Sequence, residues 1–159
     1  MSHKRAWPFA TKSIRSVSDL ENYLEGLNTN DPLAFTPYYA PDAIFKWSGQ
    51  PDRSINEFLD WVLDVHIAVT EKLSLRKAIF NGDGTVIAAE VTMQFQGNGN
   101  FETDNFVGKW GPVWPGNGPL VRAYVWYTLD KDGHIIEAIE DAHLLKAATR
   151  PSRIGKSLL

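Results

Sequence analysis

Apolar residues recur at helical spacing near the start of the chain. In the segment 17–27 the apolar positions are Val17, Leu20, Tyr23, Leu24 and Leu27. This spacing predicts an amphipathic helix, and Ser18 has a side chain suited to its N-cap. The polar segment 28–32 predicts a turn. Pro32 suits the first turn of a second, shorter helix that closes at Tyr39.

The pattern then changes from helical to alternating. A stripe of apolar residues that also contains His66 predicts a third helix over 54–71. Alternation predicts strands over 44–47, 73–80, 85–95, 101–107, 121–129 and 135–145. Asn-Gly-Asp-Gly at 81–84 and Asp-Gly at 132–133 are typical hairpin turns. This order of elements predicts an α+β domain in which helices cover a sheet.

Two stretches resemble a known superfamily. They are SDLENYLEGLNTNDPLAFTPYYAPDAIFKWS (18–48) and LVRAYVWYTLDKDGHIIEAIEDAHLL (120–145). Their order resembles the nuclear-transport-factor-2-like superfamily, which includes SnoaL-like polyketide cyclases, ketosteroid isomerases, limonene-epoxide hydrolases and scytalone dehydratases. The resemblance covers roughly 17–145 and implies a cone-shaped α+β barrel, with three N-terminal helices on a curved, mostly antiparallel sheet. It is specific for fold and not for chemistry, because this fold hosts many activities.

Composition limits the possible functions. The 159 residues suit one domain. The absence of Cys excludes disulfides and thiolate chemistry. No apolar run is long enough for a membrane span, and the basic first residues lack the apolar core of a secretory signal. We therefore expect a cytoplasmic protein without a membrane partner.

Charge is distributed unevenly along the chain. All nineteen acidic residues lie between Asp19 and Asp141, whereas seven of the sixteen basic residues lie in 1–18 and 150–159. The acidic middle argues against a nucleic-acid partner. We divide the chain into a basic N-terminal arm (1–17), a cone domain (18–149) and a basic C-terminal tail (150–159). The arm and tail are either solvated or lie on the acidic body.

Glu140 is the candidate proton-transfer residue. One face of the last strand carries Ile136, Ala138, Glu140, Ala142 and Leu144. A carboxyl group on an apolar face is either paired or has a raised pKa that suits proton transfer. The resemblance implies the second, because SnoaL-like cyclases and the epoxide hydrolases keep an acid/base Asp at this position. Two alternatives stay open: a salt bridge to Arg122 or Arg76, and a register shifted by one that places Asp141 there, with His143 beside it.

Tyr23 and His66 are further catalytic candidates. The resemblance aligns Tyr23 with the tyrosine that donates a hydrogen bond to the substrate oxygen in ketosteroid isomerases. The same alignment places Trp47 and Val125 where those isomerases keep their two Asp residues, which argues against their mechanism. His66 lies on the helix that flanks the cavity in this fold, where it can orient or polarise an oxygen. Alternatively, both are core residues, with the tyrosine hydroxyl on a backbone carbonyl.

Aromatic residues suggest a ligand. The candidate substrate-binding residues are Trp47, Trp61, Asp104, Phe106, Trp110, Tyr124 and Trp126. An aromatic, partly polar wall suits a flat apolar molecule. The loop 108–119 contains two Trp and covers a pocket or an oligomer contact, or closes the edge of the core.

These observations predict a cofactor-independent acid/base enzyme. It would be an isomerase, cyclase or dehydratase acting on a small apolar polyketide- or terpenoid-like metabolite. We expect neither a metal nor an organic cofactor, because no phosphate loop and no close His spacing occur. Two alternatives are a non-catalytic ligand-binding or dimerisation module, and an epoxide hydrolase with a water held between Asp104 and Glu140. Apolar residues on both faces of the strands 85–95 and 121–129 predict a homodimer through the open face of the sheet.

Overall fold

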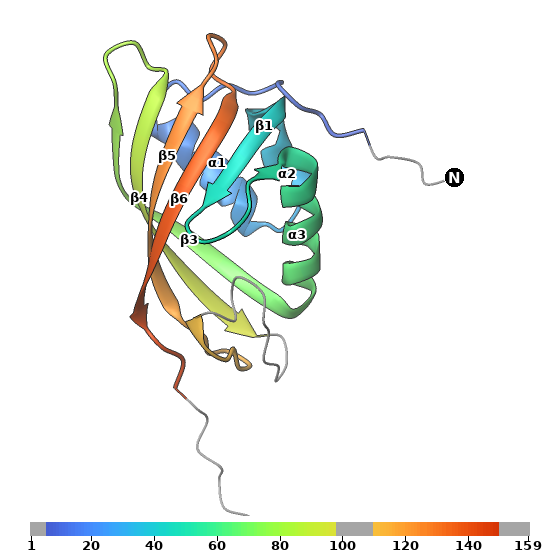
Figure 1. Ribbon diagram of the computed structural model, residues 1–159, viewed down its shortest axis with the longest axis vertical. Coiled ribbons are helices and arrows are strands. Elements are labelled where there is room, and N and C mark those ends of the chain that lie inside the picture. Colours follow the sequence, from blue (N-terminus) through green and yellow to red (C-terminus); the bar gives the residue numbers. More distant parts are fainter. Residues whose placement is uncertain (1–5, 98–109, 150–159) are drawn as a thin grey trace, which may run out of the picture.

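A computed structural model describes residues 6–97 and 110–149. Its elements are α1 (Val17–Asn28), α2 (Pro32–Phe35), a 3₁₀ turn (Thr36–Tyr38), β1 (Tyr39–Trp47), β2 (Arg53–Ser54), α3 (Ile55–Ala68), β3 (Val69–Phe80), β4 (Val86–Gly97), β5 (Leu120–Leu129) and β6 (Ile135–Lys146). The sheet order is β2-β1-β6-β5-β4-β3, with β1 and β6 parallel and the other pairs antiparallel. The helices lie on one side of a curved sheet (Figure 1), which confirms the predicted α+β cone.

The helix ends differ from the predicted ones in two places. Ser16, and not Ser18, caps α1, because its side chain accepts the backbone N–H of Asp19. Helix α3 begins with a capping box at Ser54 and ends three residues before the predicted end. From Val69 onward the backbone is extended and pairs with β4. The segment 69–71 therefore belongs to a strand.

One bulge changes which residues of β6 face inward. Thr128 pairs with Glu137, but Leu129 pairs with Ile135, so the register shifts there. Ile135 is buried and Ile136 is exposed, the reverse of the predicted alternation. The reason is that a bulge adds one residue and exchanges the two faces. Beyond the bulge the alternation holds as predicted up to Ala142, whereas Leu144, predicted on the inner face, is exposed. The predicted strand 101–107 lies outside the described residues.

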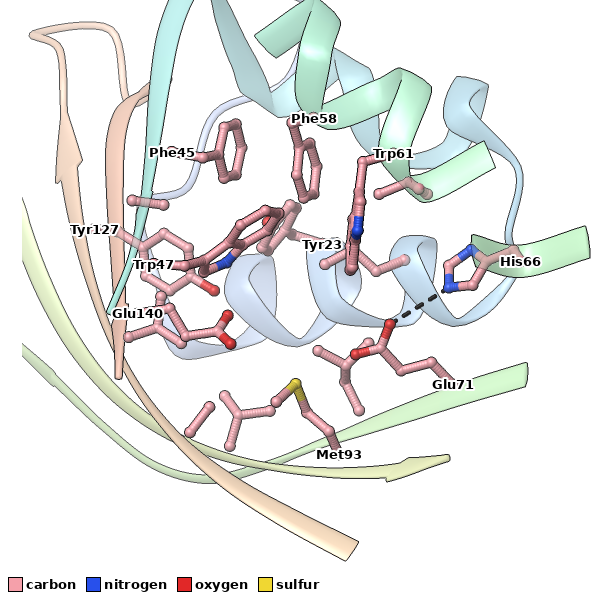
Figure 2. Close-up of a pocket in the computed structure, with 17 residues that line it drawn as sticks. Tyr23, Phe45, Trp47, Phe58, Trp61, His66, Glu71, Met93, Tyr127 and Glu140 are labelled. Atoms are coloured by element: carbon pink, nitrogen blue, oxygen red, sulfur yellow. Dashed lines mark hydrogen bonds and ion pairs between the residues drawn. The ribbon is translucent and has the colours of Figure 1, made fainter. Parts of the chain in front are cut away.

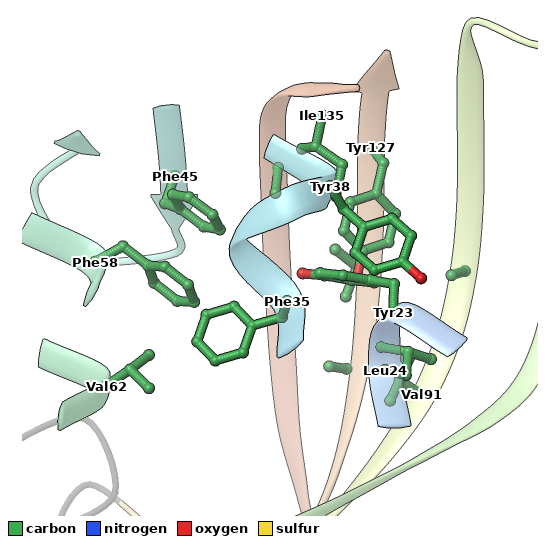
Figure 3. Close-up of a cluster of buried hydrophobic side chains, with 14 of the residues drawn as sticks. Tyr23, Leu24, Phe35, Tyr38, Phe45, Phe58, Val62, Val91, Tyr127 and Ile135 are labelled. Atoms are coloured by element: carbon green, nitrogen blue, oxygen red, sulfur yellow. The ribbon is translucent and has the colours of Figure 1, made fainter. Parts of the chain in front are cut away.

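An aromatic cluster joins the helices to the sheet (Figure 3). The Tyr23 ring on α1 makes edge-to-face contacts with Tyr39 and Tyr127, with centroids 5.6 and 5.9 Å apart. The rings of Phe45 and Phe58 stack at 3.9 Å between β1 and α3. Such pairs add specific geometry to the burial of apolar area. The cluster therefore sets how deeply each helix lies in the cone.

The described part of the predicted N-terminal arm is packed against the body. Ile14 is fully buried, and its N–H donates to the carbonyl of Gly133 at 2.9 Å. The guanidinium of Arg15 donates to the carbonyl of Lys131 at 2.8 Å. Backbone hydrogen bonds and the apolar side chains of Trp7, Phe9 and Ile14 therefore hold residues 6–16 against the body. Residues 1–5 and the predicted tail 150–159 lie outside the described residues.

Candidate active site

A cavity lies between α1, α3 and the inner face of the sheet (Figure 2). Its aromatic wall comes from β1 and α3, and consists of Phe45, Trp47, Phe58 and Trp61. Its aliphatic floor comes from β4 and β5, and consists of Val91, Met93, Ala123 and Val125. The enclosed volume is about 60 Å³. Since one water needs roughly 15 Å³ of such space, the cavity has room for a few waters in this conformation.

Glu140 lines this cavity from β6. Its Cα lies in register with Trp47 on one side and Val125 on the other, and its carboxyl group points into the cavity (Figure 2). Asp141 is exposed on the opposite face, where its carboxylate lies 3.1 Å from His143. The register alternative that placed Asp141 in the cavity is therefore wrong.

The two arginines weighed as partners of Glu140 lie elsewhere. Arg122 is on the outer face of the sheet, with its Nε 3.1 Å from a carboxylate oxygen of Glu90. Arg76 is exposed beside a bulge in β3. Neither lines the cavity. The predicted alternative of a salt bridge from Glu140 to Arg122 or Arg76 is therefore wrong.

Three buried tyrosine hydroxyls meet beside Glu140. The Tyr23 hydroxyl is hydrogen-bonded to that of Tyr39 and also shares a hydrogen bond with Tyr127. Its partners are therefore hydroxyls, in contrast to the backbone carbonyl of the alternative reading. Burial raises the pKa of all three phenols well above the usual value, and the charge of Glu140 raises each pKa further. The hydroxyls consequently remain protonated and can donate hydrogen bonds near neutral pH.

Sequence reasoning missed Tyr39 and Tyr127. Tyr127 follows the apolar alternation of β5, which carries Val121, Ala123 and Val125 on its inner face. That alternation was a usable signal for its inward position. The inward position of Tyr39 was harder to predict. This residue lies where a helical segment ends and a strand begins, so neither the helical nor the alternating pattern applies to it.

His66 and Glu71 lie at the other end of the cavity (Figure 2). His66 is in the last turn of α3, and its Nε2 lies 3.4 Å from a carboxylate oxygen of Glu71. Their side chains are only 8% and 13% exposed. The sequence pattern placed Glu71 on the polar side of a helix, whereas it is an inward position of β3. Its role in the cavity could be seen only once the end of α3 was known.

The predicted substrate-binding residues divide into four groups. Trp47 and Trp61 line the cavity. Tyr124 and Trp126 do not, because they alternate to the outer face of β5 and are 48% and 55% exposed. The prediction that they line the cone is corrected accordingly.

Trp110 packs against the buried core and is not among the residues that line the cavity. Asp104 and Phe106 lie outside the described residues, as does the whole predicted strand 101–107 that contains them.

Potential metal ligands gather away from the cavity. Within residues 6–97 and 110–149 the one such group is Asp130, Asp132 and His134 in the β5–β6 turn, with ligand atoms within 4.8 Å of one another. The His134 ring lies 3.0 Å from the Asp130 carboxylate, and two backbone N–H groups donate to the same side chain. These hydrogen bonds stabilise the turn without an ion. In the same part of the chain, no helix has the length and apolar character needed to cross a membrane.

Fold and cavity together define a class: cone-shaped α+β proteins that enclose a small pocket between helices and a curved sheet. The chain belongs to the family described as SnoaL-like domain, whose model matches residues 20–138. This confirms the resemblance seen in the sequence. A search of curated proteins finds no match.

Solved structures share the fold at low sequence identity. A candidate polyketide cyclase from Pseudomonas putida is 20% identical, with a TM-score of 0.62 over 76% of this chain and 86% of that chain. One from Silicibacter is 17% identical, with a TM-score of 0.63 over 84% and 91%. An epoxide hydrolase from M. tuberculosis of the LEH-like type is 12% identical, with a TM-score of 0.57 over 78% and 79%. Identities this low show the fold alone.

Proposed function

We propose that this protein is a cofactor-independent acid/base enzyme in which Glu140 transfers a proton to or from a small apolar carbonyl compound. The observation that carries the proposal is the place of Glu140: a carboxyl group directed into an otherwise largely apolar cavity. A non-catalytic module with Glu140 held by Arg122 or Arg76 would place those arginines at the cavity, and both lie outside it.

The tyrosine cluster supplies the second part of the mechanism. Removal of a proton from the carbon next to a carbonyl leaves negative charge on the carbonyl oxygen. Tyr23 lines the cavity, and in this proposal its hydroxyl donates a hydrogen bond to that oxygen. Tyr39 and Tyr127 hold this hydroxyl in place through their own hydrogen bonds. In a cavity shielded from bulk water, such a fixed donor stabilises developing charge more strongly than water does.

At a carbon next to a carbonyl group, isomerisation, aldol-type cyclisation and dehydration each use such a proton transfer. The family and the neighbouring structures described as candidate polyketide cyclases support this group of reactions. We propose a polyketide- or terpenoid-like metabolite as the natural substrate. The epoxide hydrolase reading depends on Asp104, which lies outside the described residues, and stays a prediction.

The size of the cavity constrains how such a metabolite enters. A benzene-sized ligand needs a cavity of roughly 150 Å³, more than the 60 Å³ enclosed here. We propose that Trp61 moves when a ring-sized substrate binds. It is the half-buried member of the aromatic wall, whereas Phe45, Trp47 and Phe58 are buried.

We also propose a homodimer through the outer face of the sheet. An apolar row crosses four paired strands there, formed by Ile79, Ala88, Trp126 and Ile139. The next row carries both signs of charge, with Lys77, Glu90, Tyr124 and Asp141. Contiguous exposed apolar surface of this kind marks an interface, and mixed charges allow a copy of the same face to pair with it.

The experiment that tests the catalytic role uses pentan-2-one in D₂O. Exchange of the protons next to its carbonyl, followed by NMR, reports proton transfer directly. We expect Glu140→Gln to slow the protein-catalysed exchange by roughly two to four orders of magnitude, as for other lost general bases. Asp141→Asn is the matched control, because this neighbouring carboxylate faces away from the cavity, and it should keep the wild-type rate. Equal rates for wild type and Glu140→Gln would remove Glu140 from the mechanism.

A further inference from the structure

The cavity contains a second acid/base pair that proton transfer by Glu140 does not need. His66 and Glu71 line the cavity at the end opposite Glu140 (Figure 2). A shift of a proton between two carbons needs one base and one donor to the carbonyl oxygen, and Glu140 and Tyr23 already supply these. The proton transfer therefore leaves His66 and Glu71 without a role.

His66 differs from the other described histidines in its surroundings. His134 and Asp130 pair in the β5–β6 turn, and His143 and Asp141 pair on the outer face. Only the His66 pair contributes to the cavity wall among the described residues. These other pairs therefore offer matched controls for a test of His66.

One nitrogen of His66 is buried and has no hydrogen-bond partner among the described residues. Its Nε2 lies 3.4 Å from the Glu71 carboxylate, which as an acceptor keeps the proton on Nε2 in the neutral ring. The Nδ1 atom is then an acceptor, and it is shielded from solvent without a hydrogen-bond partner among the described residues. A buried polar atom without a partner is unfavourable, and a hydroxyl group of a ligand would satisfy it.

We infer that the cavity takes a hydroxy-ketone, with the carbonyl group at the Tyr23–Glu140 end and the hydroxyl group at the His66–Glu71 end. This inference rests on the proposed function, since the carbonyl end is defined by it. His66 binds the hydroxyl group and selects for it. Glu71 is a positioning residue that sets the tautomer of His66. Once Trp61 has moved as proposed above, the apolar wall and floor between the two ends accommodate the carbon chain.

Paired linear probes test this inference. Pentan-2-one, hexan-2-one and heptan-2-one are compared with 5-hydroxypentan-2-one, 6-hydroxyhexan-2-one and 7-hydroxyheptan-2-one. Dissociation constants are measured from the tryptophan indole signals in NMR titrations, because Trp47 and Trp61 line the cavity. For the hydroxy-ketone of matching length we expect binding about tenfold tighter than for its parent ketone, the effect of one buried hydrogen bond.

Variants assign that gain to His66. His66→Phe should abolish the advantage of the hydroxyl group, so that a ketone and its hydroxy-ketone bind this variant with equal affinity. Glu71→Gln should reduce the advantage, and His66→Gln, which keeps a polar group, should retain part of it even if His66→Phe fails to fold. His143→Phe on the outer face is the control and should bind like the wild type.

The outcomes separate the inference from the proposed function. Equal affinities for every ketone and its hydroxy-ketone, or a gain that survives in both His66→Gln and His66→Phe, would overturn the inference. If Glu140→Gln still slows exchange of pentan-2-one, the proposed function stands in either case. If no ketone or hydroxy-ketone binds, both are overturned.

Discussion

The inner and outer faces of β5 and β6 have similar compositions but different surroundings. Tyr127 and Glu140 face a cavity covered by helices, whereas their neighbours Trp126 and Asp141 face outward, on the side of the sheet where none of the described helices lies (Figure 1). Each face therefore carries an aromatic residue and a carboxylate. The two faces differ in whether helices pack over them. This packing sets the local dielectric environment, which in turn affects the hydrogen bonds and the pKa values of the side chains on each face. The predictions below test this difference.

The largest expected difference concerns stability. Tyr127→Ala removes a ring that is 3% exposed and hydrogen-bonded to Tyr23. We expect it to lower the free energy of unfolding by roughly 3–5 kcal/mol, as for other buried aromatic residues. Trp126→Ala changes a 55% exposed side chain, and in the monomer its effect should stay within about 1 kcal/mol. Urea unfolding at low protein concentration measures both values, and equal losses would contradict the distinction between the two faces.

The second prediction concerns association. Trp126→Asp places a charge in the centre of the outer apolar row and should weaken the proposed dimer by about 2 kcal/mol or more, roughly thirtyfold in the dissociation constant. Sedimentation velocity across a concentration series measures this. Ser74→Asp is the control, because Ser74 is an exposed residue of β3 away from the row. A wild type that remains monomeric at high micromolar concentration would rule out the dimer.

The third prediction concerns alkaline pH. The pKa of Tyr23, Tyr39 and Tyr127 is raised in the folded state by burial. Their contribution to stability is therefore complete below the unfolded pKa of about 10, and is lost as the pH rises above it, because only the unfolded chain then ionises. Each such tyrosine adds about 1.4 kcal/mol per pH unit to this loss. Tyr127→Phe should reduce the slope by that amount, measured as the free energy of unfolding against pH. An unchanged slope would show that Tyr127 ionises in the folded state.

The smallest expected effect concerns the aromatic wall. Trp61→Ala should enlarge the cavity and tighten the binding of cyclohexanone several-fold, because less movement of the wall is needed. Fluorescence or NMR titration measures the affinity. Trp126→Ala is the control on the outer face and should leave the affinity unchanged. Weaker binding by Trp61→Ala would show that Trp61 contacts the ligand and does not block it.

Much of the fold could be predicted from local patterns. The three helices and the principal hairpins follow from periodicity and turn residues, and the stretches 18–48 and 120–145 carried the resemblance to the family. The position of Glu140 on the inner face was also predicted, although the bulge beside Ile135 reversed the faces at the start of the strand. A bulge depends on how two strands pair, and a single strand's alternation carries no signal of it.

The candidate site was predicted only in part. Tyr23, His66 and Glu140 line one cavity, but Glu71 was assigned to a helix because the boundary between α3 and β3 lies between apolar residues that suit either element. Tyr124 and Trp126 were assigned to the cavity because aromatic content does not reveal which face of a strand is covered. Which face of β5 is buried depends on where helices from distant parts of the sequence pack against the sheet.

The sequence by itself determined the elements, their order and the alternation that separates Glu140 from Asp141, because periodicity and turn chemistry are local properties of the chain. Only the tertiary structure decided that one face of the sheet is covered by α1 and α3 and the other is not. It also decided that three tyrosine hydroxyls meet near Glu140 and that Glu71 reaches His66. These outcomes depend on the curvature of the sheet and on contacts between residues far apart in the chain, which no local pattern records.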